Sequence, residues 1–159
     1  MHTHTNTAQD TEDFGWQLAC ARPPDEHAFA VLYLTGELGA GKTTFARGFL
    51  RALGVAAPVR SPTYTLLESY AAGALTVLHI DLYRLNDPAE LETLGLREWA
   101  RPAHLWLVEW PEKGAARLPP AHLTLRFSVG NSGHDIDVSA LSALGTRWLV
   151  QLTGEPRHA

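Results

Sequence analysis

The clearest pattern in the chain is an uninterrupted apolar run that is followed by an amphipathic stretch. Residues 28–34 are almost all apolar and show no alternation, as expected for a strand that is covered on both faces of a sheet. After a glycine-containing loop, apolar side chains recur at helical spacing at Phe45, Phe49, Leu50 and Leu53. Gly54 then suits a left-handed helix end. The pattern therefore predicts a buried strand that a loop joins to a helix.

Short helices and hairpins are predicted for the rest of the chain. A first helix follows Thr11, which we interpret as its N-cap, and ends at residues 22–25. Antiparallel hairpins are expected within residues 61–81 and 123–138, because each range holds two strand-like runs separated by a turn. The remaining predicted elements are a short helix after Asp87-Pro88, an apolar strand at residues 105–109, and a helix or strand within residues 139–154.

The loop between the buried strand and the amphipathic helix carries the main chemical signal. Residues 36–43 read GELGAGKT and fit the pattern G-x-x-x-x-G-K-[ST] of a phosphate-binding P-loop at every fixed position. Its glycines let backbone N–H groups approach phosphate oxygens, and the helix start adds the positive end of a dipole. Lys42 is expected to reach the β- and γ-phosphates, and the Thr43 hydroxyl is left for Mg²⁺. The sequence therefore predicts nucleotide binding.

The motif also indicates the fold class. We predict an α/β protein with a P-loop NTPase-like mixed sheet, flanking helices and antiparallel edge hairpins. A chain of 159 residues is long enough for one such domain and too short for a second independent one. We assign residues 11–154 to a single P-loop ATPase domain, residues 1–10 to a flexible N-terminus and residues 155–159 to a C-terminal tail.

Two acidic residues follow apolar strands and are candidates for the second half of the site. Asp81 closes the run 77–80, and Glu109 closes the run 105–108. In an open α/β sheet, strand ends of this kind face the ligand crevice, and a P-loop enzyme uses acidic groups there for its metal. Either carboxylate could hold Mg²⁺ directly while the other acts through water, or one could orient the attacking water. Each could instead simply cap a loop.

Composition narrows the range of partners and compartments. The formal net charge is −4 and the sequence pI is about 6.0, with arginines scattered along the chain, so no basic surface for strong direct nucleic-acid binding is apparent. Cys20 is the single cysteine, no apolar run has the length of a membrane span, and residues 1–13 hold no signal-peptide core. We expect a cytoplasmic protein without a membrane partner.

Four sequence blocks, taken in order and spacing, are similar to the bacterial TsaE ATPase family. They are residues 36–45 (GELGAGKTTF), 61–66 (SPTYTL), 79–85 (HIDLYRL) and 107–112 (LVEWPE). The resemblance extends from about Thr11 to about Leu125, and the four blocks together are far more specific than the P-loop alone. The family serves the synthesis of N6-threonylcarbamoyladenosine on tRNA.

The resemblance implies a function that is exerted through partners. It implies ATP and Mg²⁺ as cofactors, and association with the threonylcarbamoyl-transferase subunit TsaD and its companion TsaB. ATP hydrolysis would support their reaction cycle without transferring the threonylcarbamoyl group, and tRNA would be contacted only indirectly. We expect hydrolysis by the isolated chain to be slow and to be activated by the partner subunits.

The resemblance also implies roles for individual residues. ATP would be bound by Thr11, Leu38, Gly39, Ala40, Gly41, Lys42, Thr43 and Thr44. Mg²⁺ would lie near Thr43, Asp81 and Glu109, with catalytic roles for Lys42, Asp81 and Glu109. A nucleotide-sensing switch and the partner surface would involve Ser61, Pro62, Thr63, Tyr83, Arg84 and Trp110. The family tends to place an arginine near the last hairpin, where this chain has His134 and Asp135, so the resemblance implies no nucleotide contact for these two residues.

Several of these residues also have a purely structural interpretation. Ser61-Pro62 is an ordinary turn dipeptide, Trp110 could fill core, and Tyr83-Arg84 could be a buried ring beside a surface charge. His79 alternates with apolar neighbours, which favours a core histidine over a catalytic base.

Three other functions compete with an ATPase of this family. A small-molecule kinase would need an acceptor pocket and an arginine-bearing lid, which Arg97 and Arg101 could supply. A GTPase is disfavoured because the Asn/Thr-Lys-x-Asp pattern is absent and Lys113 lies in Glu-Lys-Gly. A nucleotide-gated binding module that scarcely hydrolyses ATP would differ only in its turnover with and without partners.

Overall fold

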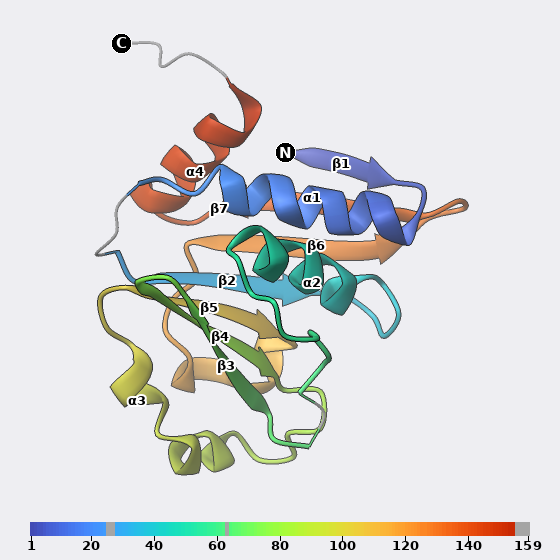
Figure 1. Cartoon of the computed structure of the whole chain (residues 1–159). Coiled ribbons are helices and arrows are strands. Elements are labelled where there is room, and N and C mark those ends of the chain that lie inside the picture. The colour runs from blue at the N-terminus through green and yellow to red at the C-terminus, as the bar shows by residue number, and fades with distance from the viewer. Residues whose placement is uncertain (25–27, 63, 155–159) are drawn as a thin grey trace.

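A single mixed sheet forms the centre of the computed structural model, which describes residues 1–24, 28–62 and 64–154 (Figure 1). Within these residues the sheet has seven strands in the order β1-β7-β6-β2-β5-β4-β3. The strands are β1 (His2–Thr5), β2 (Ala30–Thr35), β3 (Leu67–Ala72), β4 (Leu75–Asp81), β5 (His104–Glu109), β6 (Leu123–Val129) and β7 (His134–Ala140). β2, β4, β5 and β6 are parallel, and the antiparallel pairs β3–β4, β6–β7 and β1–β7 lie at the two edges. The predicted fold class, a mixed α/β sheet with edge hairpins, is confirmed.

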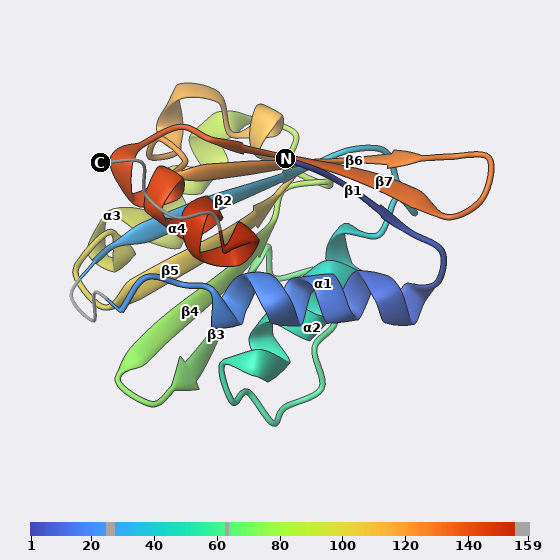
Figure 2. The same cartoon turned by 90° about the horizontal axis from the view of Figure 1, so that it is seen from above.

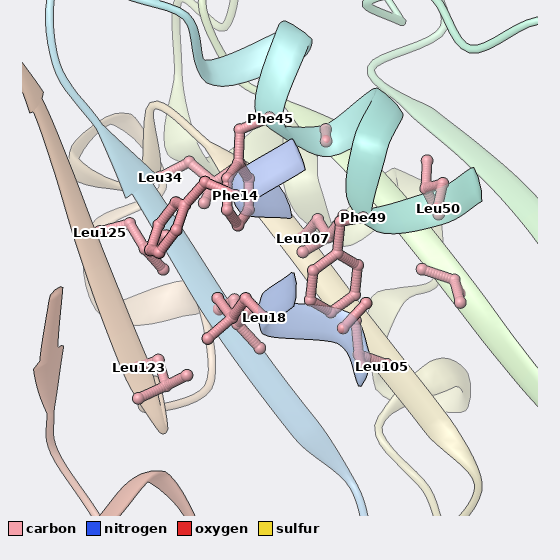
Figure 3. Close-up of a cluster of buried hydrophobic side chains, with 14 of the residues drawn as sticks. Phe14, Leu18, Leu34, Phe45, Phe49, Leu50, Leu105, Leu107, Leu123 and Leu125 are labelled. Atoms are coloured by element: carbon pink, nitrogen blue, oxygen red, sulfur yellow. The ribbon is translucent and has the colours of Figure 1, made fainter. Parts of the chain in front are cut away.

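Helices cover both faces of the sheet. The α-helices are α1 (Ala8–Cys20), α2 (Lys42–Ala52), α3 (Leu96–Trp99) and α4 (Ala143–Thr153), and the 3-10 helices are Pro88–Leu94, Pro111–Lys113 and Ala115–Arg117. α1 and α2 lie side by side on one face, as both views show (Figures 1 and 2). On this face Phe14 and Leu18 of α1 and Phe45 and Phe49 of α2 pack on strand residues such as Leu107 (Figure 3). A second apolar cluster fills the opposite face under α3 and the first 3-10 helix.

The central strand β2 shows why the sequence pattern lacks alternation. Leu32 and Leu34 belong to the cluster under α1 and α2, while Val31 belongs to the cluster on the other face. All three side chains are completely buried. Because both faces are covered, successive residues of the strand must all be apolar. The strand predicted for residues 28–34 is therefore confirmed, with bounds Ala30–Thr35.

The helix pair α1–α2 is held at unusually short range by two glycines. A Cβ atom at Gly48 would overlap the backbone carbonyl of Glu12, and one at Gly15 would overlap that of Phe45. The helices therefore touch backbone to backbone, and this contact fixes the start of α2 relative to α1. The P-loop leads directly into this first turn of α2.

Gly48→Ala is expected to lower the free energy of unfolding by about 3 kcal/mol, because the added methyl group meets backbone that cannot rotate away. Chemical denaturation of the variant and the parent measures the change. Gln17→Ala, on the exposed side of α1, should stay within about 0.5 kcal/mol of the parent. An alanine at position 48 without loss of stability would contradict the close helix contact.

The N-terminus differs from the flexible segment predicted for residues 1–10. Residues 2–5 form β1, which pairs with β7, and His4 Nδ1 lies 2.8 Å from a carboxylate oxygen of Asp135. This hydrogen bond raises the pKa of His4. The prediction was wrong because the short polar segment gains its order from a strand about 130 residues away in the sequence, which no local pattern reveals.

The first helix also begins earlier than predicted. Thr7, not Thr11, is the N-cap, and its side chain and that of Asp10 form a reciprocal capping box. Thr11 is buried inside the helix, where its hydroxyl lies 2.8 Å from the hydroxyl of Thr5 on β1.

The remaining predicted elements are found with smaller changes. Both hairpins are present, and the tail forms helix α4 with Ser142 as N-cap. The helix after Asp87 is of the 3-10 type, with Asp87 and Glu90 in a capping box and Gly95 in the left-handed conformation behind it. The predicted C-terminal tail, residues 155–159, lies outside the described residues.

Candidate active site

The loop between β2 and α2 has the backbone geometry of a phosphate-binding loop. Gly36, Gly39 and Gly41 have φ angles of 135°, 78° and 103°, which only glycine adopts without strain. At Gly36 a side chain would also overlap the backbone carbonyl of Phe127 on β6. The loop thus places the first turn of α2 at the carboxyl end of β2, and this helix has no side-chain cap on its first N–H groups. Such a helix start favours an anion.

A pocket of ≈ 450 Å³ opens at this loop, at the carboxyl ends of β2, β4 and β5. Its lining includes most of the predicted site residues, namely Thr11, Leu38, Gly39, Gly41, Lys42, Thr43, Thr44, Ser61, Asp81, Tyr83, Arg84, Glu109 and Trp110. Ala40 does not line it, because its side chain is in the core and its N–H donates to the Glu37 carbonyl. Pro62 is buried outside the pocket, and Thr63 lies outside the described residues.

Lys42 is almost completely buried beside the loop that it is expected to serve. Its Nζ donates to the carbonyl oxygens of Gly36 and, at 2.8 Å, Glu37, and lies 4.4 Å from the centre of the Trp110 ring. Burial lowers the pKa of Lys42, while the nearby carboxylates, Glu109 first among them, act in the opposite direction. Backbone carbonyls thus hold the ammonium group at the loop, and a phosphate group could replace them as its partners.

The two predicted acids are neighbours across the strands β4 and β5. Asp81 and Glu109 occupy paired positions at the ends of these parallel strands. Glu109, which is 2% exposed, accepts from the Thr43 hydroxyl at 2.9 and 3.2 Å through its two oxygens. Asp81 accepts from the Ser61 hydroxyl and, at 2.9 Å, from the backbone N–H of Tyr83. Both carboxylates therefore face the phosphate loop, as predicted, but with different partners.

These oxygen atoms suit Mg²⁺ better than a transition metal. The hydroxyl of Thr43 and the carboxylates of Glu109 and Asp81 line the same pocket, and Mg²⁺ prefers oxygen ligands. Within the described ranges there is no group of three or more His, Cys, Asp or Glu side chains that could enclose a metal by itself. A set of one or two carboxylates and a hydroxyl is the kind that Mg²⁺ uses together with phosphate oxygens.

Aromatic and basic side chains surround the mouth of the pocket. Trp110 has a left-handed backbone with φ 57° and contacts the Tyr83 ring at a centroid distance of 5.1 Å. Tyr64, which is 88% exposed, lies under the Arg84 guanidinium at 5.1 Å. Trp110 therefore belongs to the pocket wall and does not simply fill the core.

Sequence reasoning missed three residues of this region. Ala8 on α1 and His134 on β7 line the pocket, and the imidazole of His134 lies close to Gly41. The sequence had identified His134 only as a departure from the family pattern. His79 was interpreted as a core histidine, yet its Nε2 lies 2.6 Å from Glu109 Oε2. Its spacing of two residues from Asp81 on a strand, which places both side chains on one face, could have indicated this contact.

The candidate kinase lid is not found at the pocket. Arg97 lines a separate cavity near α3, and Arg101 lies next to His104, which is at the opposite end of β5 from Glu109.

No helix among the described residues is long and apolar enough to span a membrane.

Comparison with known proteins places these features in a family. The family model "Threonylcarbamoyl adenosine biosynthesis protein TsaE" matches residues 5–136. The proteins of Haemophilus influenzae and Bacillus subtilis named tRNA threonylcarbamoyladenosine biosynthesis protein TsaE are 43% and 38% identical to this chain; the alignments cover 72% and 88% of this chain and 73% and 83% of those proteins. The crystal structure of Bacillus subtilis YdiB superposes with a TM-score of 0.78 at 28% identity, over 97% of this chain and 94% of that one. The chain therefore belongs to the TsaE family.

Proposed function

We propose that this chain is the Mg²⁺-dependent ATP-binding and ATP-hydrolysing subunit required for N6-threonylcarbamoyladenosine modification at position 37 of tRNA. In this proposal it acts with TsaD and TsaB and does not itself transfer the threonylcarbamoyl group. The observation that carries the proposal is the contact of Thr43 with Glu109 beside Lys42, inside the P-loop pocket. Because it would support the modification of tRNA, we place the protein in the cytoplasm.

The residues of the pocket would divide the work between phosphate and metal. Backbone N–H groups at the start of α2 and the Lys42 ammonium would bind the phosphates and stabilise the negative charge that develops on them. Thr43 and Glu109 would hold Mg²⁺, which supplies charge neutralisation on the phosphate oxygens. We assign the direct contact to Glu109 because it shares the Thr43 hydroxyl, whereas Asp81 is engaged by Ser61.

Asp81 would connect the nucleotide site to the switch. Its two oxygens are held by Ser61, which follows the loop behind α2, and by the backbone of Tyr83. A change in the contacts of Asp81 would therefore affect both the 61–66 loop and residues Tyr83 and Arg84 at the mouth of the pocket. We propose this as the path by which nucleotide state alters the partner surface.

An ATPase explains the pocket better than the competing functions do. The kinase alternative loses support because Arg97 and Arg101 lie away from the pocket mouth. A nucleotide-gated module without turnover shares the same pocket, and it differs from an ATPase in whether the two carboxylates matter for hydrolysis.

Asp81→Asn and Glu109→Gln are both expected to reduce Mg²⁺-dependent ATP hydrolysis, by about 10-fold to 100-fold for Asp81 and at least 100-fold for Glu109. Each amide keeps the shape of the side chain and removes its charge. Initial rates across a magnesium titration, with TsaD and TsaB present, measure the effect. Glu98→Gln, which removes an acid far from the pocket, should leave the rate unchanged. Normal turnover in either site variant would refute the metal or catalytic role of that residue and leave it only a structural role as a cap.

A further inference from the structure

We propose that His79 is a positioning residue of this site: its imidazole holds the Glu109 carboxylate in the orientation that meets Thr43 and receives Mg²⁺. This inference rests on the proposed function. It extends that function to a side chain that does not line the pocket.

The geometry fixes Glu109 from two directions. His79 lies on β4, completely buried, and its Nε2 is 2.6 Å from Glu109 Oε2 on β5. An ionised carboxylate can only accept, so Nε2 is the donor. From the other side, the Thr43 hydroxyl of α2 donates to the same carboxylate. Glu109 is thereby locked between a neighbouring strand and the first turn of the P-loop helix.

The other ring nitrogen shows that packing alone does not explain a histidine at this position. His79 Nδ1 is buried and has no hydrogen-bond partner in the described structure. Val77, Leu105 and Leu107, which lie beside His79 on this face of the sheet, are buried and apolar. The two acids on the same face, Glu68 and Asp81, form no hydrogen bond with Nδ1. An unpaired buried polar atom costs free energy, which a leucine in the same place would avoid. The histidine therefore carries a local cost in folding free energy, and its hydrogen bond with Glu109 is the contact that offsets this cost.

Loss of this contact should act on the metal and spare the phosphate contacts. Lys42 and the loop glycines have no hydrogen bond with His79, so nucleotide binding without metal does not depend on it. Without the Nε2 donor, the Glu109 side chain would be held by Thr43 alone and would have to be ordered when Mg²⁺ binds. Groups that orient metal ligands in this way typically contribute 10-fold to 100-fold to metal affinity.

A pair of amide variants separates this role from a structural one. His79→Gln places an N–H donor near the position of Nε2, whereas His79→Asn keeps the polarity but is too short to reach Glu109. Val77→Ala, two residues earlier on the same face of β4, is the control for lost packing. Calorimetric titration of each full-length variant with ADP, with and without Mg²⁺, and thermal unfolding are the measurements. They need no turnover.

His79→Asn is expected to weaken the Mg²⁺-dependent part of ADP binding by about 10-fold to 100-fold, with ADP binding in EDTA changed by less than about threefold. His79→Gln should recover most of the loss, and Val77→Ala should show none of it. Equal magnesium dependence in the Asn variant and the parent, or an equal loss with and without magnesium, would overturn the role. If the parent itself bound ADP without any response to Mg²⁺, the metal assignment of the proposed function would fail first.

Discussion

Replacing Lys42 with alanine is expected to weaken ATP binding by about 100-fold or more and to leave the fold intact. Loss of one partner from a buried, charge-assisted contact typically costs about 2 to 5 kcal/mol, or about 30-fold to 4,000-fold in Kd, and the expected loss lies within this range. Lys42 now donates to the carbonyls of Gly36 and Glu37, and these contacts keep its ammonium group beside the place where phosphate would bind. Isothermal titration with ATP measures the loss.

The second lysine of the chain provides a matched control. Lys113 also lies near the Trp110 ring, at 5.9 Å, but it donates to the Tyr83 carbonyl and does not line the pocket. Lys113→Ala should therefore bind ATP within about threefold of the parent. Thermal unfolding of both variants shows whether the fold is kept, because α2 begins at Lys42. ATP affinity equal to that of the parent in Lys42→Ala would refute the assignment of the P-loop.

The sequence predicts those parts of the site that depend on contiguous residues. The P-loop is a local motif in which glycine spacing determines the backbone path, and the structure has positive φ at the three expected glycines. Asp81 and Glu109 could be predicted because a carboxylate at the end of an apolar run is a local signal. Parallel strands then bring such ends to one edge of the sheet.

Contacts between distant segments could not be predicted in the same way. β1 is short and polar, and it forms a strand because it pairs with the edge of β7. Its two histidines also contact the carboxylates of Asp135 and Asp137 on β7. His79 has the periodicity of any core residue, and only the register of β4 against β5 brings it to Glu109. The sequence predicts Thr11 as a helix cap, whereas its hydroxyl contacts Thr5 on β1. This contact could not be predicted because the sequence does not indicate that strand.

The distribution of positive charge supports a division of labour between this chain and its proposed partners. The net charge is −4, and several arginines are already paired within the molecule. Arg47 and Arg51 both contact Glu12, and Arg117 contacts Glu92. Neutralising an RNA backbone requires clusters of uncompensated Lys and Arg. In the proposed function the partner subunits therefore carry the tRNA, and this chain carries the nucleotide.

The isolated chain is accordingly expected to bind tRNA with a Kd weaker than about 10 μM at moderate salt and to hydrolyse ATP slowly. With TsaD and TsaB, ATP turnover should rise, and multi-turnover threonylcarbamoyl transfer should fall by about 10-fold or more when this subunit is omitted or carries Lys42→Ala. The physical reason is that Ser61 is hydrogen-bonded to Asp81 in the P-loop pocket, so ATP binding and hydrolysis would change the loop that we propose as the switch toward the partners. Titration with tRNA tests the first expectation and a reconstituted modification assay tests the second, with Glu98→Gln, away from the pocket, as the control that should retain full activity. Tight tRNA binding by this chain alone, or undiminished multi-turnover modification without its ATPase, would show that the labour is divided differently.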